Sequence, residues 1–221
     1  MSGTPRLRVW DLPTRLFHWA LALLVVCSVV TAQVGGLWMD WHLRAGYAAL
    51  ALLLFRLLWG VFGSRYARFT QFVRGPSAVL AYLRALRTGG AAPQAGHNPL
   101  GALSVLAMLA ALLVQAATGL FANDAIATEG PLAKFVSGST SDFLTRVHKL
   151  NQYVLYTLVA LHVAAIAFYR VIKREDLLRP MITGDRTGVA GEPARDDLAM
   201  RLRAALLLAL AAGAVAYLVT R

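Results

Sequence analysis

The stretch HKLNQYVLYTLVALH, residues 148–162, places a histidine at each end of a mostly apolar run. An α-helix turns about 100° and rises about 1.5 Å per residue. Fourteen residues therefore bring His162 back to within about 40° of the face that carries His148, roughly 21 Å further along the axis. We predict a membrane-spanning helix that presents two imidazoles on one face, at two depths of the bilayer.

The rest of the chain has the composition of an integral membrane protein. Its 221 residues are 58% hydrophobic and 15% charged, whereas a soluble domain carries about 25% charged residues. A helix needs about 20 apolar residues to cross the hydrocarbon core. The runs that meet or approach this length are 16–34, 45–63, 99–121, 153–169 and 204–220. The first run is too long for a cleaved signal peptide and contains His18 and Gln33, so we expect it to remain as a span.

The positive charges follow membrane topology rather than a nucleic-acid partner. The net charge is +11, yet the basic residues gather in the N-terminal segment and in segments 64–98 and 170–180. Segments 35–44 and 122–146 carry at least as many acidic residues as basic ones. By the positive-inside rule the N-terminus is cytoplasmic, and five spans leave the C-terminus outside. We therefore expect the lipid bilayer, and no nucleic acid, as the partner of this charge pattern.

Local signals mark the ends of several segments. Residues 11–13, Asp-Leu-Pro, are typical of a helix start. Residues 75–90 predict a short amphipathic helix on the inner membrane surface. In the stretch GHNPLG, Asn98 is expected to cap the third span, with Pro99 at its first helical position. Residues 183–197 predict a polar linker to the fifth span.

The topology assigns a depth to each of four histidines. His18 lies near the inner end of the first span, and His42 lies near the outer start of the second. The fourth span runs inward, so His148 is outer and His162 is inner. The four residues therefore form two depth-matched pairs, His18 with His162 and His42 with His148.

Two such pairs favour haem binding over zinc binding or a packing role. A single histidine of this kind is as readily a packing or interface residue, but ionisable residues inside a membrane are rare and usually functional. Zinc is disfavoured because no third and fourth protein ligands lie at either depth. Two facing imidazoles ligate haem iron between helices, and a chain whose one cysteine is Cys27 lacks the CxxCH attachment of c-type haem. We predict two b-type haems whose iron ligands are the four histidines. Gly46, one turn beyond His42, either leaves room for a porphyrin face or packs against a helix.

Other polar residues are expected around these pairs. Arg56 lies fourteen residues after His42, where it either neutralises a haem propionate or extends to the inner interface. His97 lies in an inner loop and is expected to make a polar loop or propionate contact rather than to bind iron. Four residues near the outer pair either hydrogen-bond the ligand histidines or hold a quinone. They are Gln33, Asn151, Gln152 and Tyr153.

Four motifs together resemble the bacterial cytochrome b561 family, which includes the b-type cytochrome subunits of nickel–iron hydrogenases. They are VWDLPTRLFHW at 9–19, H-x3-G…R-x2-WG at 42–60, GHNPLG at 96–101 and H-x13-H at 148–162. The resemblance covers residues 8–180 and implies an all-α, four-helix membrane bundle. Such a bundle binds two haems b between its helices and exchanges electrons with quinones in the bacterial inner membrane. The axial ligands of that family match His18, His42, His148 and His162.

The fifth span is an addition to this four-helix bundle. We accordingly expect a di-haem cytochrome domain over 1–180, a linker over 181–199 and an additional membrane helix over 200–221.

These features predict an electron carrier, with no catalytic residue of its own. Iron with imidazoles at both axial positions has no open site for substrate, so electron transfer is its natural chemistry. The partners expected are quinone and either a periplasmic cytochrome c or a subunit of a redox enzyme, and a homodimer is compatible with the sequence. Two alternatives remain open at this point: a superoxide:quinone oxidoreductase, and a haem-bearing membrane anchor of a larger redox enzyme.

Overall fold

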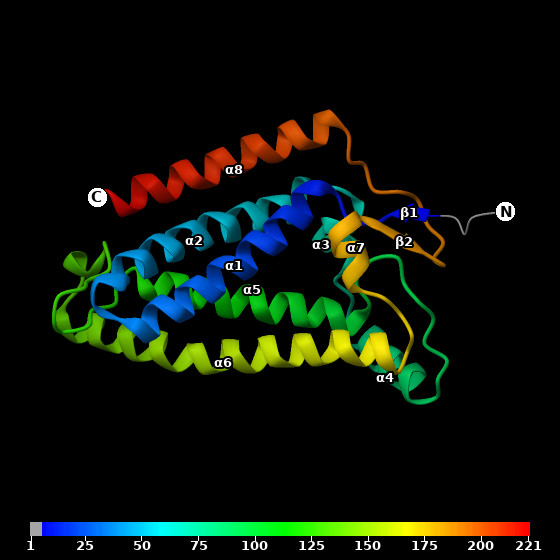
Figure 1. Cartoon of the computed structure of the whole chain (residues 1–221), viewed down its shortest axis with the longest axis horizontal. Helices are drawn as coiled ribbons and strands as arrows, with labels where there is room; N and C mark the ends of the chain where they lie inside the picture. The colour runs from blue at the N-terminus through cyan, green and yellow to red at the C-terminus, as the bar shows by residue number, and fades with distance from the viewer. Residues whose placement is uncertain (1–5) are drawn as a thin grey trace. The chain divides into compact units, whose positions relative to one another are not determined.

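The computed structural model describes residues 6–221, and the protein is 72% helical. Within these residues five helices are long and apolar enough to cross a membrane (Figure 1). They are α1 (Leu12–Val34), α2 (Met39–Phe62), α5 (Pro99–Gly119), α6 (Gly138–Val171) and α8 (Leu198–Val219). The five predicted spans and the all-α membrane fold are thus confirmed. The fourth helix is longer than expected, because α6 begins ten residues before His148.

Short elements connect these helices. They are β1 (Arg6–Arg8), η1 (Gly36–Trp38), η2 (Arg65–Ala67), α3 (Phe69–Phe72), α4 (Pro76–Arg87), η3 (Ala133–Phe135), α7 (Leu178–Thr183) and β2 (Asp185–Thr187). Helix α4 corresponds to the amphipathic helix expected over 75–90. Strands β1 and β2 form an antiparallel ribbon in which Leu7 pairs with Arg186. The sequence analysis did not predict this ribbon.

The chain divides into two compact units, and each long helix contributes to both. The first unit contains residues up to 16 together with 58–107 and 159–204, and the second contains 17–57, 108–158 and 205–221. We describe the two units separately. The division expected from the sequence, at 180 and 200, stays a prediction about which parts of the chain are functionally separate.

In the first unit, a buried carboxylate fixes the start of α1. Asp11 is fully buried, and its Oδ1 accepts the main-chain N–H of Thr14 at 2.6 Å, which is the bond of a helix N-cap. Its Oδ2 accepts the indole N–H of Trp59 at 3.3 Å and the hydroxyl of Ser64. The predicted helix start is therefore correct, and the same carboxylate joins the first turn of α1 to the last turn of α2.

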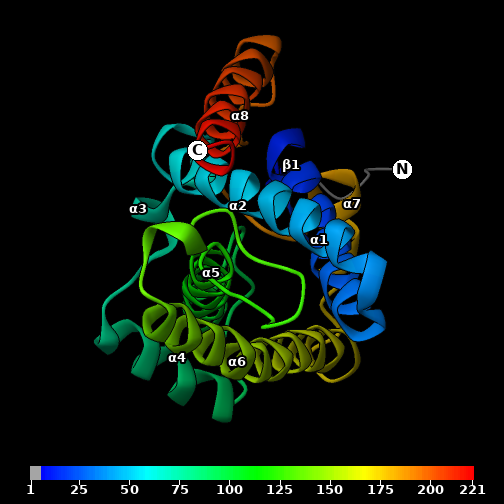
Figure 2. The same cartoon turned by 90° about the vertical axis from the view of Figure 1, so that its left-hand side faces the viewer.

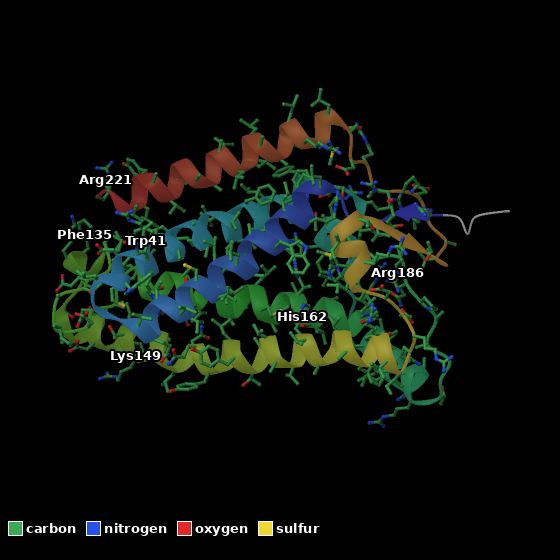
Figure 3. All side chains as sticks on the ribbon, in the orientation of Figure 1. Trp41, Phe135, Lys149, His162, Arg186 and Arg221 are labelled. Carbon is green, nitrogen blue, oxygen red and sulfur yellow. The ribbon has the colours of Figure 1, made fainter. Side chains whose placement is uncertain are left out.

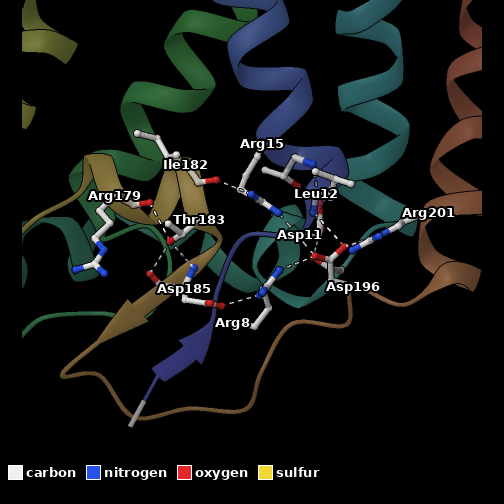
Figure 4. A network of polar contacts seen from close by, with 12 residues as sticks. Arg8, Asp11, Leu12, Arg15, Arg179, Ile182, Thr183, Asp185, Asp196 and Arg201 are labelled. Atoms are coloured by element: carbon white, nitrogen blue, oxygen red, sulfur yellow. Dashed lines mark hydrogen bonds and ion pairs between the residues drawn. The ribbon is translucent and has the colours of Figure 1, made fainter. Parts of the chain in front are cut away.

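The linker before α8 is held in the first unit by a second carboxylate (Figure 4). Asp196 accepts hydrogen bonds from Nη1 of Arg8 at 2.7 Å, from the main-chain N–H of Leu12 at 3.1 Å and from Nε of Arg201 at 3.2 Å. Burial alone would raise the pKa of Asp196, but Arg201, the Leu12 N–H and Arg8 together hold it below the ordinary value. One side chain thus connects strand β1, helix α1 and helix α8.

The N-terminal end of α5 is capped as the sequence predicts. Asn98 Oδ1 accepts the main-chain N–H of Gly101 at 2.8 Å, and Pro99 is the first residue of α5. The side-chain nitrogen Nδ2 of Asn98 donates to the hydroxyl of Tyr169 at 2.9 Å. The Tyr169 hydroxyl in turn lies 2.7 Å from the hydroxyl of Tyr82. These buried contacts dock α4 and α6 onto the start of α5.

In the second unit, apolar packing joins α8 to α2 and to the end of α5. Leu50, Ala51, Leu120 and Val215 form one buried cluster, and in Figure 2 the last turns of α8 lie beside α2. Just after α8, the main-chain oxygen of Arg221 accepts a hydrogen bond from Lys134 Nζ at 2.6 Å. Figure 3 labels Arg221 together with Phe135 of η3. The additional helix is therefore packed against the bundle rather than separate from it.

The loop between α5 and α6 in the second unit is ordered by its own polar groups. The Asp124 carboxylate accepts three main-chain N–H groups, those of Thr128, Ile126 and Ala127, each at 2.9 Å. These bonds hold the pKa of Asp124 well below its usual range. The loop thus keeps a fixed turn before α6 begins at Gly138.

Candidate functional site

The second unit brings the rings of two of the four predicted ligands close together. His42, in the first turns of α2, and His148, on α6, have ring centroids 6.2 Å apart and rings inclined at 84°. Both side chains are half-buried. This is the outer pair that depth matching predicts.

Hydrogen bonds define which nitrogen of each ring carries the proton. Nδ1 of His42 lies 2.9 Å from the main-chain oxygen of Ser28, and Nδ1 of His148 lies 2.9 Å from that of Gln115. A carbonyl oxygen only accepts hydrogen bonds, so Nδ1 carries the proton in each ring. A neutral imidazole then has its lone pair on Nε2, and a metal-binding histidine with a carbonyl on its other nitrogen has this arrangement.

The spacing and the nearby glycines suit a metal-bearing macrocycle between the two rings. Two metal–imidazole bonds of about 2 Å each, with the radius of each ring added, span about 6 Å, which the measured separation matches. At Gly119 a Cβ atom would lie 2.9 Å from Cε1 of His148, so only glycine allows the ring to lie this close to α5. At Gly46 a Cβ atom would meet nothing within 4 Å. Gly46 is therefore not a close-packing glycine, and the residues present fit a haem b.

A pair of carboxamides completes this part of the second unit. Asn151 Nδ2 donates to Gln115 Oε1 at 2.7 Å and to the main-chain oxygen of Ala111 at 2.9 Å. Gln115 Nε2 lies 3.1 Å from His148 Nε2, and Thr118 Oγ1 lies 3.4 Å from His148 Nδ1. Iron held at His148 Nε2 would replace the contact with Gln115 Nε2, whereas the bond from His148 Nδ1 to the Gln115 main-chain oxygen uses the other ring nitrogen.

Gln115 and Thr118 are not among the site residues predicted from the sequence. Gln115 has a readable signal, since it is the one carboxamide in the apolar stretch of α5. The contact of His42 with Ser28 cannot be predicted from the sequence, because it uses a main-chain carbonyl and every residue has a main-chain carbonyl. Among the polar residues that were predicted near the pair, Asn151 contacts Gln115 rather than a histidine. Within residues 6–221, no hydrogen bond links Gln33, Gln152 or Tyr153 to a histidine.

The remaining predicted site residues are distributed over both units. His18, in the second unit, lies edge-on to Trp19 with centroids 4.9 Å apart. His162 lies on α6 in the first unit (Figure 3). The pairing of these two histidines stays a prediction.

Arg56 and His97 are both packed into the protein. The side chain of Arg56, in α2, is only 4% exposed, which is not the geometry of an arginine that extends to the membrane surface. Its role as a propionate partner stays a prediction. His97 lies between the rings of Trp10 and Phe72, with centroids 4.7 and 4.8 Å away, so it is an aromatic-packed loop residue of the first unit.

The family model for prokaryotic cytochrome b561 matches residues 9–184. The chain belongs to the prokaryotic cytochrome b561 family. No curated protein and no solved structure matches it significantly. As a member of this family the chain is a multi-pass membrane cytochrome of the b type, which binds haem b and transfers electrons. The match ends at residue 184, before α8 begins at Leu198, and the fifth helix as an addition to the family bundle stays a prediction.

Proposed function

We propose that this cytochrome holds two haems b, each between two histidines, and passes electrons between the quinone pool and a redox partner. The observation that supports it best is the outer pair, in which the ring centroids of His42 and His148 lie 6.2 Å apart and both Nδ1 atoms bond to main-chain carbonyls. Bis-imidazole haem b supplies one-electron transfer without an open coordination site. The rest of the proposal concerns what the chain itself contributes.

The residues fix the ligand atoms before any group binds. The carbonyls of Ser28 and Gln115 hold each outer imidazole in the tautomer that leaves Nε2 as donor. His18 and His162 supply the second pair in the proposal. Arg56, buried in α2, places a positive charge at the depth of that inner pair, where it balances a propionate.

The charge distribution supports a cytoplasmic N-terminus in the bacterial inner membrane. The basic segments 64–98 and 170–180 both belong to the first unit, whereas segments 35–44 and 122–146, with their balanced charge, belong to the second. By the positive-inside rule the basic segments 64–98 and 170–180 then lie on the cytoplasmic side. The outer histidine pair belongs to the periplasmic side, where a cytochrome c or an enzyme subunit docks.

Haem content and reoxidation kinetics of the purified protein test this proposal together. Pyridine haemochrome quantitation should give two haems b per chain. After reduction, stopped-flow mixing with a ubiquinone analogue or cytochrome c should reoxidise the protein faster than mixing with air-saturated buffer, because two axial imidazoles leave oxygen only outer-sphere transfer. A ratio of one would contradict the two-haem proposal. Rapid binding of carbon monoxide would contradict bis-histidine ligation, and equally slow oxidation by every acceptor would contradict the electron-carrier role.

A further inference from the structure

The carboxamide pair lies directly beside a predicted iron ligand. Asn151 follows His148 by three residues and therefore lies on a neighbouring part of the same face of α6. Its Nδ2 bridges two acceptors of α5 that are one helical turn apart, the carbonyl of Ala111 and Oε1 of Gln115. Asn151 thus fastens α6 to α5 at the level of His148.

Gln115 contacts both nitrogens of the same imidazole. Its main-chain oxygen accepts the Nδ1 proton of His148 at 2.9 Å, and its side-chain nitrogen lies 3.1 Å from Nε2. Asn151 donates to Oε1 of Gln115, and this bond fixes which end of the Gln115 amide is oxygen and which is nitrogen. The three residues form one connected set of hydrogen bonds.

Two carboxamides in an apolar helix bundle lower its stability unless they have a structural or functional role there. An amide that is removed from water without a hydrogen-bond partner lowers stability, and in these two half-buried side chains Asn151 Nδ2 and Gln115 Oε1 satisfy each other. Leucine at both positions would meet the requirement of a membrane span without this cost. The arrangement is therefore explained better by what it does to His148 than by packing.

We propose that Asn151 and Gln115 are positioning residues that hold His148 as an iron ligand and thereby set the reduction potential at the outer pair. This inference rests on the proposed bis-histidine haem at His42 and His148. A firm bond from Nδ1 to a carbonyl makes the imidazole a stronger donor, which favours the ferric state and lowers the potential. Loosening α6 from α5 weakens that bond, and the weaker donor favours the ferrous state.

Asn151→Leu and its neighbour Gln152→Leu form a matched test. Gln152 lies on the same helix and makes no hydrogen bond to His148 within the described residues. In potentiometric titrations of the purified two-haem protein, Asn151→Leu should raise the potential of one haem component and alter its ferric low-spin EPR signal. We expect a change of up to about tenfold in the ferrous-to-ferric ratio, which corresponds to about 59 mV for one electron. Gln152→Leu should leave both quantities at their wild-type values.

Variants at Gln115 separate positioning from general disruption. Gln115→Leu should raise the potential of the same component, and the double variant with Asn151→Leu should shift it no further, because the two amides act as one unit. Gln115→Glu keeps the acceptor for Asn151 and adds negative charge, so it should shift the potential in the opposite direction. Equal effects of Asn151→Leu and Gln152→Leu, additive shifts, or the same sign for Gln115→Leu and Gln115→Glu would each overturn the inference. A wild-type protein without a haem at His42 and His148 would instead overturn the proposed function.

Discussion

The first unit contains ion pairs around partly buried carboxylates, whereas in the second unit neutral groups surround the histidine pair. In the first unit Asp196 binds two arginines, and Arg186 pairs with Glu175 at 2.7 Å with side chains only 11% and 18% exposed. In the second unit imidazoles, carboxamides and main-chain carbonyls bind one another.

This difference follows from the cost of charge in hydrocarbon. Removing two charges from water costs several kcal/mol per ion unless the pair is well arranged, and inside a bilayer there is no water to share the cost. Neutral donors avoid the cost and leave a lone pair on each Nε2. Arg56 is the exception, a buried cation in the second unit, and this motivates the propionate partner proposed for it.

The largest expected effect is the loss of a whole cofactor from the second unit. His42→Ala and His148→Ala should each lower the haem-to-protein ratio from two to one and remove the same spectral component, because the two side chains face each other across one position. Pyridine haemochrome assays and potentiometric titration measure this. His97→Ala is the matched control in the first unit and should retain both haems, since that ring packs between Trp10 and Phe72. Loss of different components from the two variants would show that His42 and His148 do not share a site.

Next in size is a change of stability in the first unit without a change of cofactor. Asp11→Ala removes the N-cap of α1 and leaves the indole of Trp59 and the hydroxyl of Ser64 without their acceptor. We expect a loss of about 2–4 kcal/mol, from the cap and the buried hydrogen bonds together. The thermal midpoint of unfolding in detergent should fall, while the haem-to-protein ratio should stay unchanged. Asp142→Asn, on the exposed first turns of α6, should change the midpoint little, and an equal fall in both variants would contradict the capping role.

Arg56→Leu should affect one haem more than the other. The buried guanidinium stabilises the more negative ferrous state, so its removal should lower the potential of the inner haem and leave the outer one nearly unchanged. Potentiometric titration with both components resolved measures this. Equal shifts of both components, or none, would exclude Arg56 from the propionate region.

The sequence predicts the helices of both units but only part of what joins them. The apolar runs fix the spans, and depth arithmetic on His42 and His148 places them opposite each other, although their role as ligands stays a prediction. The β1–β2 ribbon pairs three-residue strands that lie far apart in the chain, and strands this short have no periodic pattern. The contacts of the two histidines with Ser28 and Gln115 use main-chain carbonyls, so the identity of the side chains does not predict them. Long apolar periodicity is therefore readable, whereas single polar contacts between distant segments require the structure.

The smallest expected effect tests the charged side of the comparison through pH. Because the Asp196 carboxylate has a folded-state pKa below its unfolded value of about 3.9, its contribution to stability is complete above that value. The contribution is lost as the pH falls through the lower, folded-state pKa. At pH 7, Asp196→Asn should lower the thermal midpoint by about 2–4 °C, the shift expected for 1 kcal/mol in a protein of this size.

The difference between wild type and Asp196→Asn should narrow as the pH falls below about 4, where the carboxyl is protonated in the unfolded state, and should disappear once it is also protonated in the folded state. Glu129→Gln, in the exposed outer loop of the second unit, provides the control and should leave the midpoint unchanged over the whole range. A gap between wild type and Asp196→Asn that stays constant at low pH would mean that Asp196 acts through shape and hydrogen bonding. In that case the ion pairs with Arg8 and Arg201 contribute little to stability. The contrast between charged and neutral networks would then describe the positions of the groups and not their energies.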